Sequence, residues 1–126
     1  MPRFVLLEHQ WNGVHWDFML ETADGPVRTW AIDAEIVAGM DLPARALPDH
    51  RAAYLDLEGE ISEGRGAVRR VDRGEYEVVL WTDDLVKVRL VGAQLFGPVV
   101  LRRAVSGGVE DSGAVTGWLV RFGNFD

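Results

Sequence analysis

The chain has 126 residues, of which 48% are hydrophobic and 26% are charged, and this length predicts one domain with a buried core over residues 1–126. Its net charge of -7 argues against a protein whose whole surface binds nucleic acid, because phosphate binding usually needs a Lys/Arg surface. The absence of cysteine excludes a disulfide framework and a zinc–thiolate site.

The N-terminal residues are apolar only from Phe4 to Leu7 before Glu8 follows. This stretch is too short for a signal peptide, and no later run approaches the length of a membrane span. We therefore expect no association with a membrane and a cytoplasmic location.

Short segments rich in Val and aromatic residues follow one another along the chain, separated by Gly and Asp. The expected strands are Phe4–His9, Val14–Glu21, Val27–Ile32, Ala44–Leu47, Ala53–Glu58, Ala67–Asp72, Glu75–Trp81, Val86–Val91, Phe96–Ala104 and Gly117–Phe122. This pattern predicts an all-β fold, either a barrel or a sandwich.

The connecting segments carry turn residues. The stretches Thr22–Gly25 and Asp72–Gly74 have the composition of hairpin turns, Ala34–Met40 fits one short helical turn, and Val105–Val115 is expected to be a mobile loop.

The three histidines indicate where the chemistry lies. Two of them occur in the pattern His9-x5-His15-x-Asp17. In a strand over Val14–Glu21, alternation places His15, Asp17 and Met19 on one face and three apolar residues on the other. His9 can add a third ligand across the turn at residues 10–13. Two imidazoles and one carboxylate with open positions suit a catalytic Zn, Mn or Fe ion, although His-x-Asp also occurs often by chance.

The third histidine lies in Asp49-His50-x3-Tyr54-x3-Glu58-Gly59. In a strand over Ala53–Glu58, Tyr54, Asp56 and Glu58 share a polar face. His50 and Tyr54 would lie at the edge of this face. The alternative is that Tyr54 is a core aromatic residue and Glu58 a solvated charge.

These blocks resemble, in order, the 3′-phosphoesterase domain of bacterial ATP-dependent DNA ligase D. The similar segments are Glu8-His9, His15-Trp16-Asp17-Phe18-Met19-Leu20-Glu21, Arg28-Thr29-Trp30-Ala31, Asp49-His50 to Gly64, Asp72-Arg73-Gly74-Glu75-Tyr76, Val88 to Gly97 and Trp118-Leu119-Val120-Arg121. The resemblance covers nearly the whole chain and implies a small closed or partly closed β-barrel with short helical turns.

The resemblance also implies an activity, namely removal of a 3′-phosphate or a terminal ribonucleoside from a primer end with a manganese-type ion. By motif, His9, His15 and Asp17 would be the metal ligands, His50 would contact the scissile phosphate and Tyr54 would support the site. Mn is the expected metal, with Zn or Co as alternatives. The implied partners are DNA or RNA 3′ ends, together with a separate ligase or repair protein.

Two departures weaken the phosphate contacts that the resemblance implies. Met19 stands where the family pattern has an arginine, and Asp33-Ala34-Glu35-Ile36 replaces a stretch that contains a lysine. An arginine would bind phosphate oxygens in bidentate fashion, which a thioether cannot do. We expect Met19 to border the phosphate-binding region and 3′-phosphatase activity to be weak, unless Met19 instead packs the barrel. The candidate cations to replace this arginine are Arg28, Arg45, Arg51 and Arg65.

The sequence leaves other functions open. The N-terminal arm of longer family members and the polymerase and ligase domains are expected to be absent. A phosphoesterase with a small-molecule substrate, or a non-catalytic module that binds metal, a DNA end or a partner, fits the same residues. A non-haem iron oxygenase also uses two histidines and a carboxylate, but the surrounding blocks argue against it.

Overall fold

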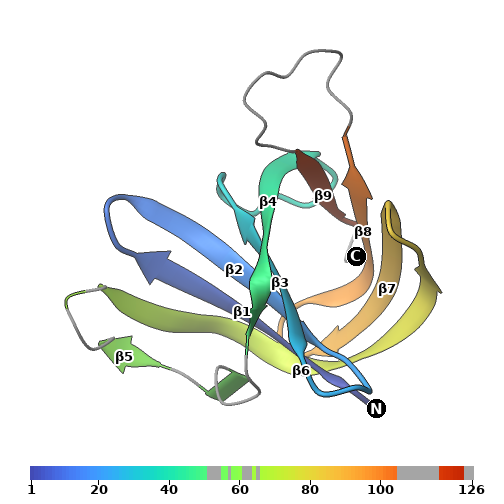
Figure 1. Ribbon diagram of the computed structural model, residues 1–126, viewed down its shortest axis with the longest axis horizontal. Helices are drawn as coiled ribbons and strands as arrows, with labels where there is room; N and C mark the ends of the chain where they lie inside the picture. Colours follow the sequence, from blue (N-terminus) through green and yellow to red (C-terminus); the bar gives the residue numbers. More distant parts are fainter. Residues whose placement is uncertain (51–54, 57, 61–63, 65, 105–116, 124–126) are drawn as a thin grey trace.

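The computed structural model describes residues 1–50, 55, 56, 58–60, 64, 66–104 and 117–123, and for His50 and Glu60 the backbone alone. Eight antiparallel strands form a closed barrel in the order β1-β2-β3-β4-β9-β8-β7-β6, with β6 returning to β1 and β5 beside β6 outside the ring (Figure 1). The bounds are β1 Arg3–Gln10, β2 Val14–Glu21, β3 Val27–Ile32, β4 Leu42–His50, β5 Gly59–Glu60, β6 Ala67–Trp81, β7 Leu85–Gly92, β8 Phe96–Arg103 and β9 Trp118–Phe122. The expected all-β barrel is confirmed.

Alternate residues of the strands fill the barrel interior, as period-2 patterning requires. Large aromatic side chains dominate this core, and the most buried are Phe4, Phe18, Trp30 and Phe122. Within the described residues no helix has the length and apolar composition needed to span a bilayer.

A second apolar cluster lies on the outer face of the barrel wall. Its members come from β1, β2, β3, β6 and the short 3₁₀ segment Leu55–Asp56, and they are Val5, Leu7, Met19, Val27, Leu55 and Val68. Because β1 and β2 bury apolar side chains on both faces, they contain the continuous apolar runs Phe4–Leu7 and Phe18–Leu20. Leu7 lies opposite Asp17 in the register and Met19 is two residues beyond Asp17 on the same face, so the outer cluster adjoins the polar residues of the β1–β2 hairpin.

The expected hairpin turn at Asp72–Gly74 is wrong, because β6 is one strand of 15 residues. Its first half pairs with β1 and β5, and its second half pairs with β7. At Gly74 the backbones come so close that a Cβ atom would clash with the carbonyl oxygen of Val91. The Asp-x-Gly pattern therefore marks a place where two strands approach closely. The residue types at this place are the same as those of a turn.

Two smaller expectations also change, and a third lies outside the described residues. Ala34–Met40 contains no helical turn, because Ala34 and Ile36 alternate inward against the core as in an extended chain. The expected strand Ala53–Glu58 is not formed at Leu55–Asp56, which is 3₁₀. The loop expected at Val105–Val115 lies outside the described residues. By contrast, the turn at Thr22–Gly25 forms the β2–β3 connection, where the Gly25 N–H donates to the carbonyl oxygen of Thr22 over 3.1 Å.

Candidate metal centre

The β1–β2 hairpin brings the two N-terminal histidines face to face. The register pairs His9 with His15 and Leu7 with Asp17, so these side chains project from the same face of the two strands. The reversal occurs at Asn12 and Gly13, whose φ angles are 56° and 107°. Asn and Gly tolerate such left-handed backbone, which fixes the register of a tight hairpin.

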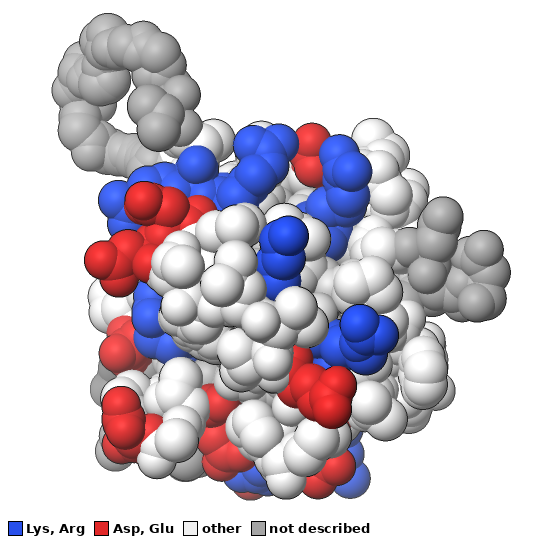
Figure 2. Space-filling view, turned by 90° about the vertical axis from the view of Figure 1, so that its right-hand side faces the viewer, with Lys and Arg blue, Asp and Glu red and all other residues white. Residues whose placement is uncertain are grey.

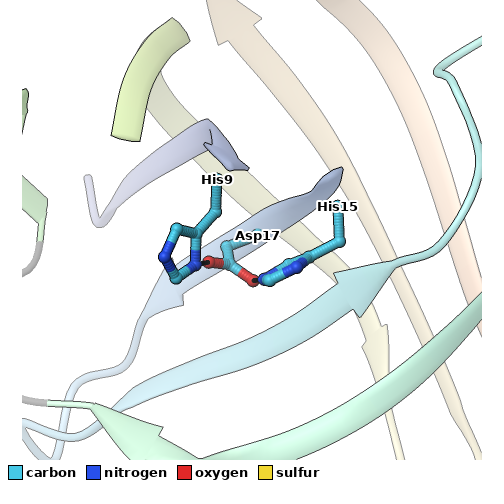
Figure 3. Close-up of side chains that lie close together, drawn as sticks. All are labelled: His9, His15 and Asp17. Carbon is cyan, nitrogen blue, oxygen red and sulfur yellow. Dashed lines mark ion pairs between the residues drawn. The ribbon is translucent and has the colours of Figure 1, made fainter. Parts of the chain in front are cut away.

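The carboxylate of Asp17 lies between the two imidazole rings (Figure 3). His9 Nδ1 is 3.6 Å from Asp17 Oδ2, and His15 Nε2 is 3.1 Å from Asp17 Oδ1. One ligand atom from each of the three residues lies within 4.8 Å of the others, in an arrangement that could hold a metal ion. The three side chains converge as the alternation predicted, and their role as metal ligands stays a prediction.

The donor set fits a divalent ion. Two ligand atoms each about 2.1 Å from one ion are separated by roughly 3.0–3.4 Å at octahedral or tetrahedral angles, which is close to both distances. Asp17 Oδ1 is buried, and among the described residues it has no hydrogen-bond partner, because the 3.1 Å contact with His15 lacks hydrogen-bond geometry. A buried carboxylate oxygen without a donor is costly, and a cation would satisfy it.

Two arginines lie in the same cross-strand row as Asp17. The register runs from Arg70 on β6 through Leu7, Asp17 and Ala31 to Arg45 on β4. Opposed residues share a face of the sheet, so both guanidinium groups extend over the outer face on either side of the candidate site.

The guanidinium of Arg45 is held by Asp33. Its Nε and Nη2 donate to the two carboxylate oxygens over 2.8 and 2.9 Å. This hydrogen bonding is the largest cause that raises the pKa of Arg45. Burial opposes it, and the charges of Asp33 and of Asp17 raise the pKa further. The charge of Asp17 therefore acts on Arg45 across β3.

Arg70 has a different environment. Its Nη1 lies 3.7 Å from Glu58 Oε1, while its Nε is buried and lacks a hydrogen-bond partner among the described residues. The sequence reasoning missed Arg70, because its proximity depends on the pairing of β6 with β1, which is distant in the sequence.

Trp11 is a further neighbour that sequence reasoning missed. Its ring stacks beside that of His9, with centroids 6.0 Å apart and an interplanar angle of 26°, and the residue is 44% exposed. The spacing of two residues from His9 was the available signal, since it favours the same side of the hairpin.

Met19 does not lie open at the site. It is 2% exposed and belongs to the outer apolar cluster with Val5, Leu7 and Leu55. The packing role that the sequence left as the alternative therefore accounts for this side chain.

The remaining predicted residues are placed less completely. The backbone of His50 ends β4 opposite Val27, four residues along β3 from Ala31, or about 13 Å at the rise of a strand. Its side chain and Tyr54 lie outside the described residues, as do Arg51 and Arg65, so the roles given to them stay predictions.

Arg28 does not reach the candidate site. Its guanidinium lies over Trp30 and Trp81, 5.5 and 5.8 Å from the ring centroids, and its Nε is 3.2 Å from Asp49. It lines a cavity of about 530 Å³ beside the β2–β3 turn, at the end of the hairpin remote from His9 and His15.

Comparison with known proteins identifies the family of the chain. The family model described as the DNA Ligase D 3′-phosphoesterase domain matches residues 7–103, which include all three residues of the cluster. No curated protein matches the chain. Since the matched region covers most of the 126 residues, the chain belongs to the DNA ligase D 3′-phosphoesterase domain family.

Proposed function

We propose that the protein is a divalent-metal-dependent 3′-phosphoesterase that acts on DNA or RNA 3′ ends. The observation that carries this proposal is the convergence of His9, His15 and Asp17 in a member of this family. Mn is the proposed metal and Zn or Co the alternatives, since imidazole and carboxylate donors suit all three.

The three residues of the cluster have different proposed roles. His9 and His15 would each offer a ring nitrogen, and Asp17 would bind while holding both rings in place. When bound, the ion supplies Lewis acidity, which stabilises charge on a phosphoryl oxygen or acidifies a water molecule. His50 is the proposed contact to the scissile phosphate, with Tyr54 in support.

The surroundings of the cluster favour a nucleic-acid end as substrate. Trp11 offers an exposed indole beside His9, and an aromatic face of this kind can stack an unpaired base for about 1–3 kcal/mol. The net charge of -7 suits recognition of a strand terminus more than a long duplex. We also propose a cytoplasmic location and action beside a separate ligase or repair protein.

A non-catalytic metal-binding module is the second candidate function. It is favoured by Met19, whose buried thioether occupies the position where the family pattern has an arginine.

The test is to titrate the purified chain with Mn, Co, Zn and Ni while following its melting temperature. Binding to the folded state at 100-fold excess over Kd stabilises it by about 2.7 kcal/mol, which is a rise of roughly 10 °C for a domain of this size. We expect His15→Ala to abolish the rise and Gln10→Ala, an exposed neighbour on β1, to preserve it.

Hydrolysis is then measured on a primer with a 3′-phosphate and on a small phosphoester. Metal-dependent release of phosphate from the primer supports the phosphoesterase, while metal binding without hydrolysis of either substrate supports the non-catalytic module. A melting temperature that none of the four metals changes would contradict both.

A further inference from the structure

The substrate phosphate needs a cation beside the ion, and the position expected to supply one carries Met19, which is buried. Four arginines of the described residues lie on β3, β4 or β6 with a charge partner, namely Arg28, Arg45, Arg69 and Arg70. Arg69 is excluded because the register pairs it with Glu8, on the opposite face of the sheet from Asp17. Arg28 is excluded because it packs over Trp30 and Trp81 by the β2–β3 turn.

The two remaining arginines, Arg45 and Arg70, differ in their surroundings. On the Arg70 side of Asp17 the intervening residue is Leu7, which is 0% exposed and fills the outer apolar cluster. On the Arg45 side it is Ala31, which is also 0% exposed but whose side chain ends at Cβ. The side chain of Arg45 is 54% exposed and that of Arg70 only 24%, so Arg45 is the arginine that a phosphate can reach from solvent. Asp17 and Arg45 are separated by two strand spacings, or about 10 Å between Cα atoms, which a phosphate group and the two side chains can span.

The pairing with Asp33 orients Arg45 without using all of its donors. Asp33 accepts from Nε and Nη2. Among the described residues Nη1 has no acceptor, so both of its N–H groups can serve another one. Asp33 belongs to the stretch that replaces the lysine-containing segment of the family pattern. This chain has thus lost a lysine there and carries in its place an acid that fixes an arginine from the next strand.

We infer that Arg45, positioned by Asp33, binds a non-bridging oxygen of the substrate's phosphate monoester while His9, His15 and Asp17 hold the ion. This inference rests on the proposed function. It assigns the phosphate contact to β4, two strands away from the position that the family pattern uses.

The barrel offers a closely matched control. Arg121 on β9 is held by Asp41 in the same bidentate manner, over 3.0 and 3.1 Å. The side chains of the two pairs are similarly exposed, 54% and 39% for Arg45 and Asp33 and 53% and 33% for Arg121 and Asp41. Replacing either arginine by glutamine removes the same charge and the same kind of ion pair.

The experiment measures the affinity of the Mn-loaded chain for inorganic phosphate by calorimetry, with Mn affinity measured separately. We expect Arg45→Gln to weaken phosphate binding about 10–100-fold, the usual worth of a charge-assisted hydrogen bond, and to leave Mn affinity unchanged. Arg45→Lys should recover part of the affinity, since it restores the charge without the planar fork. Arg121→Gln should behave as the unmodified protein.

Equal phosphate affinity in the Arg45→Gln and Arg121→Gln variants would overturn the inference. So would a loss of phosphate affinity in Arg70→Gln and not in Arg45→Gln. Failure of the Mn-loaded protein to bind phosphate would overturn it as well. The proposed function fails separately. If phosphate binding depends on Arg45 but no phosphoester is hydrolysed, the contact is real and the catalytic proposal is wrong. If a 3′-phosphate primer is hydrolysed equally with and without Arg45, the catalytic proposal stands and the phosphate contact assigned to Arg45 is wrong.

Discussion

The burial of the Asp17 carboxylate lowers the stability of the fold. It is nearly buried on a barrel wall, with one carboxylate oxygen directed at each of two imidazoles and with Oδ1 lacking a hydrogen bond among the described residues. Desolvation of a carboxylate is expensive unless a cation or several donors offset it. An unsatisfied group of this kind is typical of a site that is completed by a ligand.

Met19, two residues along β2, has the opposite character. We predict that Met19→Arg destabilises the protein by about 3–5 kcal/mol, because the guanidinium would be forced into the outer apolar cluster without a partner. Met19→Leu conserves volume and polarity and should cost less than about 1.5 kcal/mol. Urea denaturation of both variants measures the difference. A Met19→Arg variant that is as stable as Met19→Leu and hydrolyses a 3′-phosphate primer faster would show instead that the arginine reaches the ion site.

The sequence predicts this part of the site as far as local periodicity extends. Alternation along β2 and a short turn are enough to bring His9, His15 and Asp17 together. The burial of Met19 depends on Leu55 and Val68, and the placement of Arg70 depends on the β1–β6 pairing. These contacts join segments roughly 35–65 residues apart, which a local pattern does not specify.

At the scale of the elements, β6 shows most clearly how local composition misleads. Its 15 residues pair with one neighbour, cross at Gly74 and continue along another, so that a single strand closes the barrel. The Asp72 carboxylate, which is buried, accepts from the backbone N–H groups of Ala93, Gln94 and Leu95 over 3.1, 3.0 and 2.6 Å. The polar residue that looked like a turn former therefore ties β6 to the β7–β8 turn.

We predict that Asp72→Asn lowers the free energy of unfolding by about 2–4 kcal/mol. The amide replaces a charged acceptor and turns a donor toward three backbone donors, which leaves at least one of them unsatisfied. Asp84→Asn is the control, since Asp84 is exposed and pairs with Arg103 at 3.5 Å, and exposed pairs contribute little. Chemical denaturation compares the two variants, and equal midpoints would mean that the Asp72 contacts add nothing to stability.

At the scale of the whole molecule, charge is unevenly distributed although the net charge is -7. On the side of the barrel that carries β7 and the second half of β6, Lys and Arg side chains lie above and within a largely uncharged area, and Asp and Glu side chains lie along its left and lower edges (Figure 2). Exposed members of this side include Val78, Leu80, Lys87 and Arg89. The candidate metal centre lies on the β1–β2 hairpin, at the other side of the barrel in Figure 1. Composition predicted the sign of the net charge, but its distribution follows from the closure of the barrel.

The stability of the closed barrel should also depend on alkaline pH through Tyr76. This side chain is 1% exposed and its hydroxyl donates to the carbonyl oxygen of Glu21 over 2.6 Å, which joins β6 to the end of β2 across the interior. Burial, together with the charge of Glu21, raises the pKa of Tyr76 to about 12. Unfolded tyrosine titrates near pH 10, so the folded state holds its proton over a range in which the unfolded state loses it. The contribution of Tyr76 to the free energy of unfolding is therefore fully present below about pH 10. It falls by about 2–3 kcal/mol as the pH rises through 12.

We predict that Tyr76→Phe is less stable than the unmodified protein at pH 7 by about 1 kcal/mol, because the hydrogen bond to Glu21 is lost. Between pH 10 and 12 its stability should decline less steeply, since phenylalanine has no proton to lose. Urea midpoints measured at pH 7, 10 and 11.5 for both proteins test this, and the difference between them should shrink or change sign at the highest pH. A constant difference across the three values would show that Tyr76 ionises as readily in the folded barrel as in the unfolded chain.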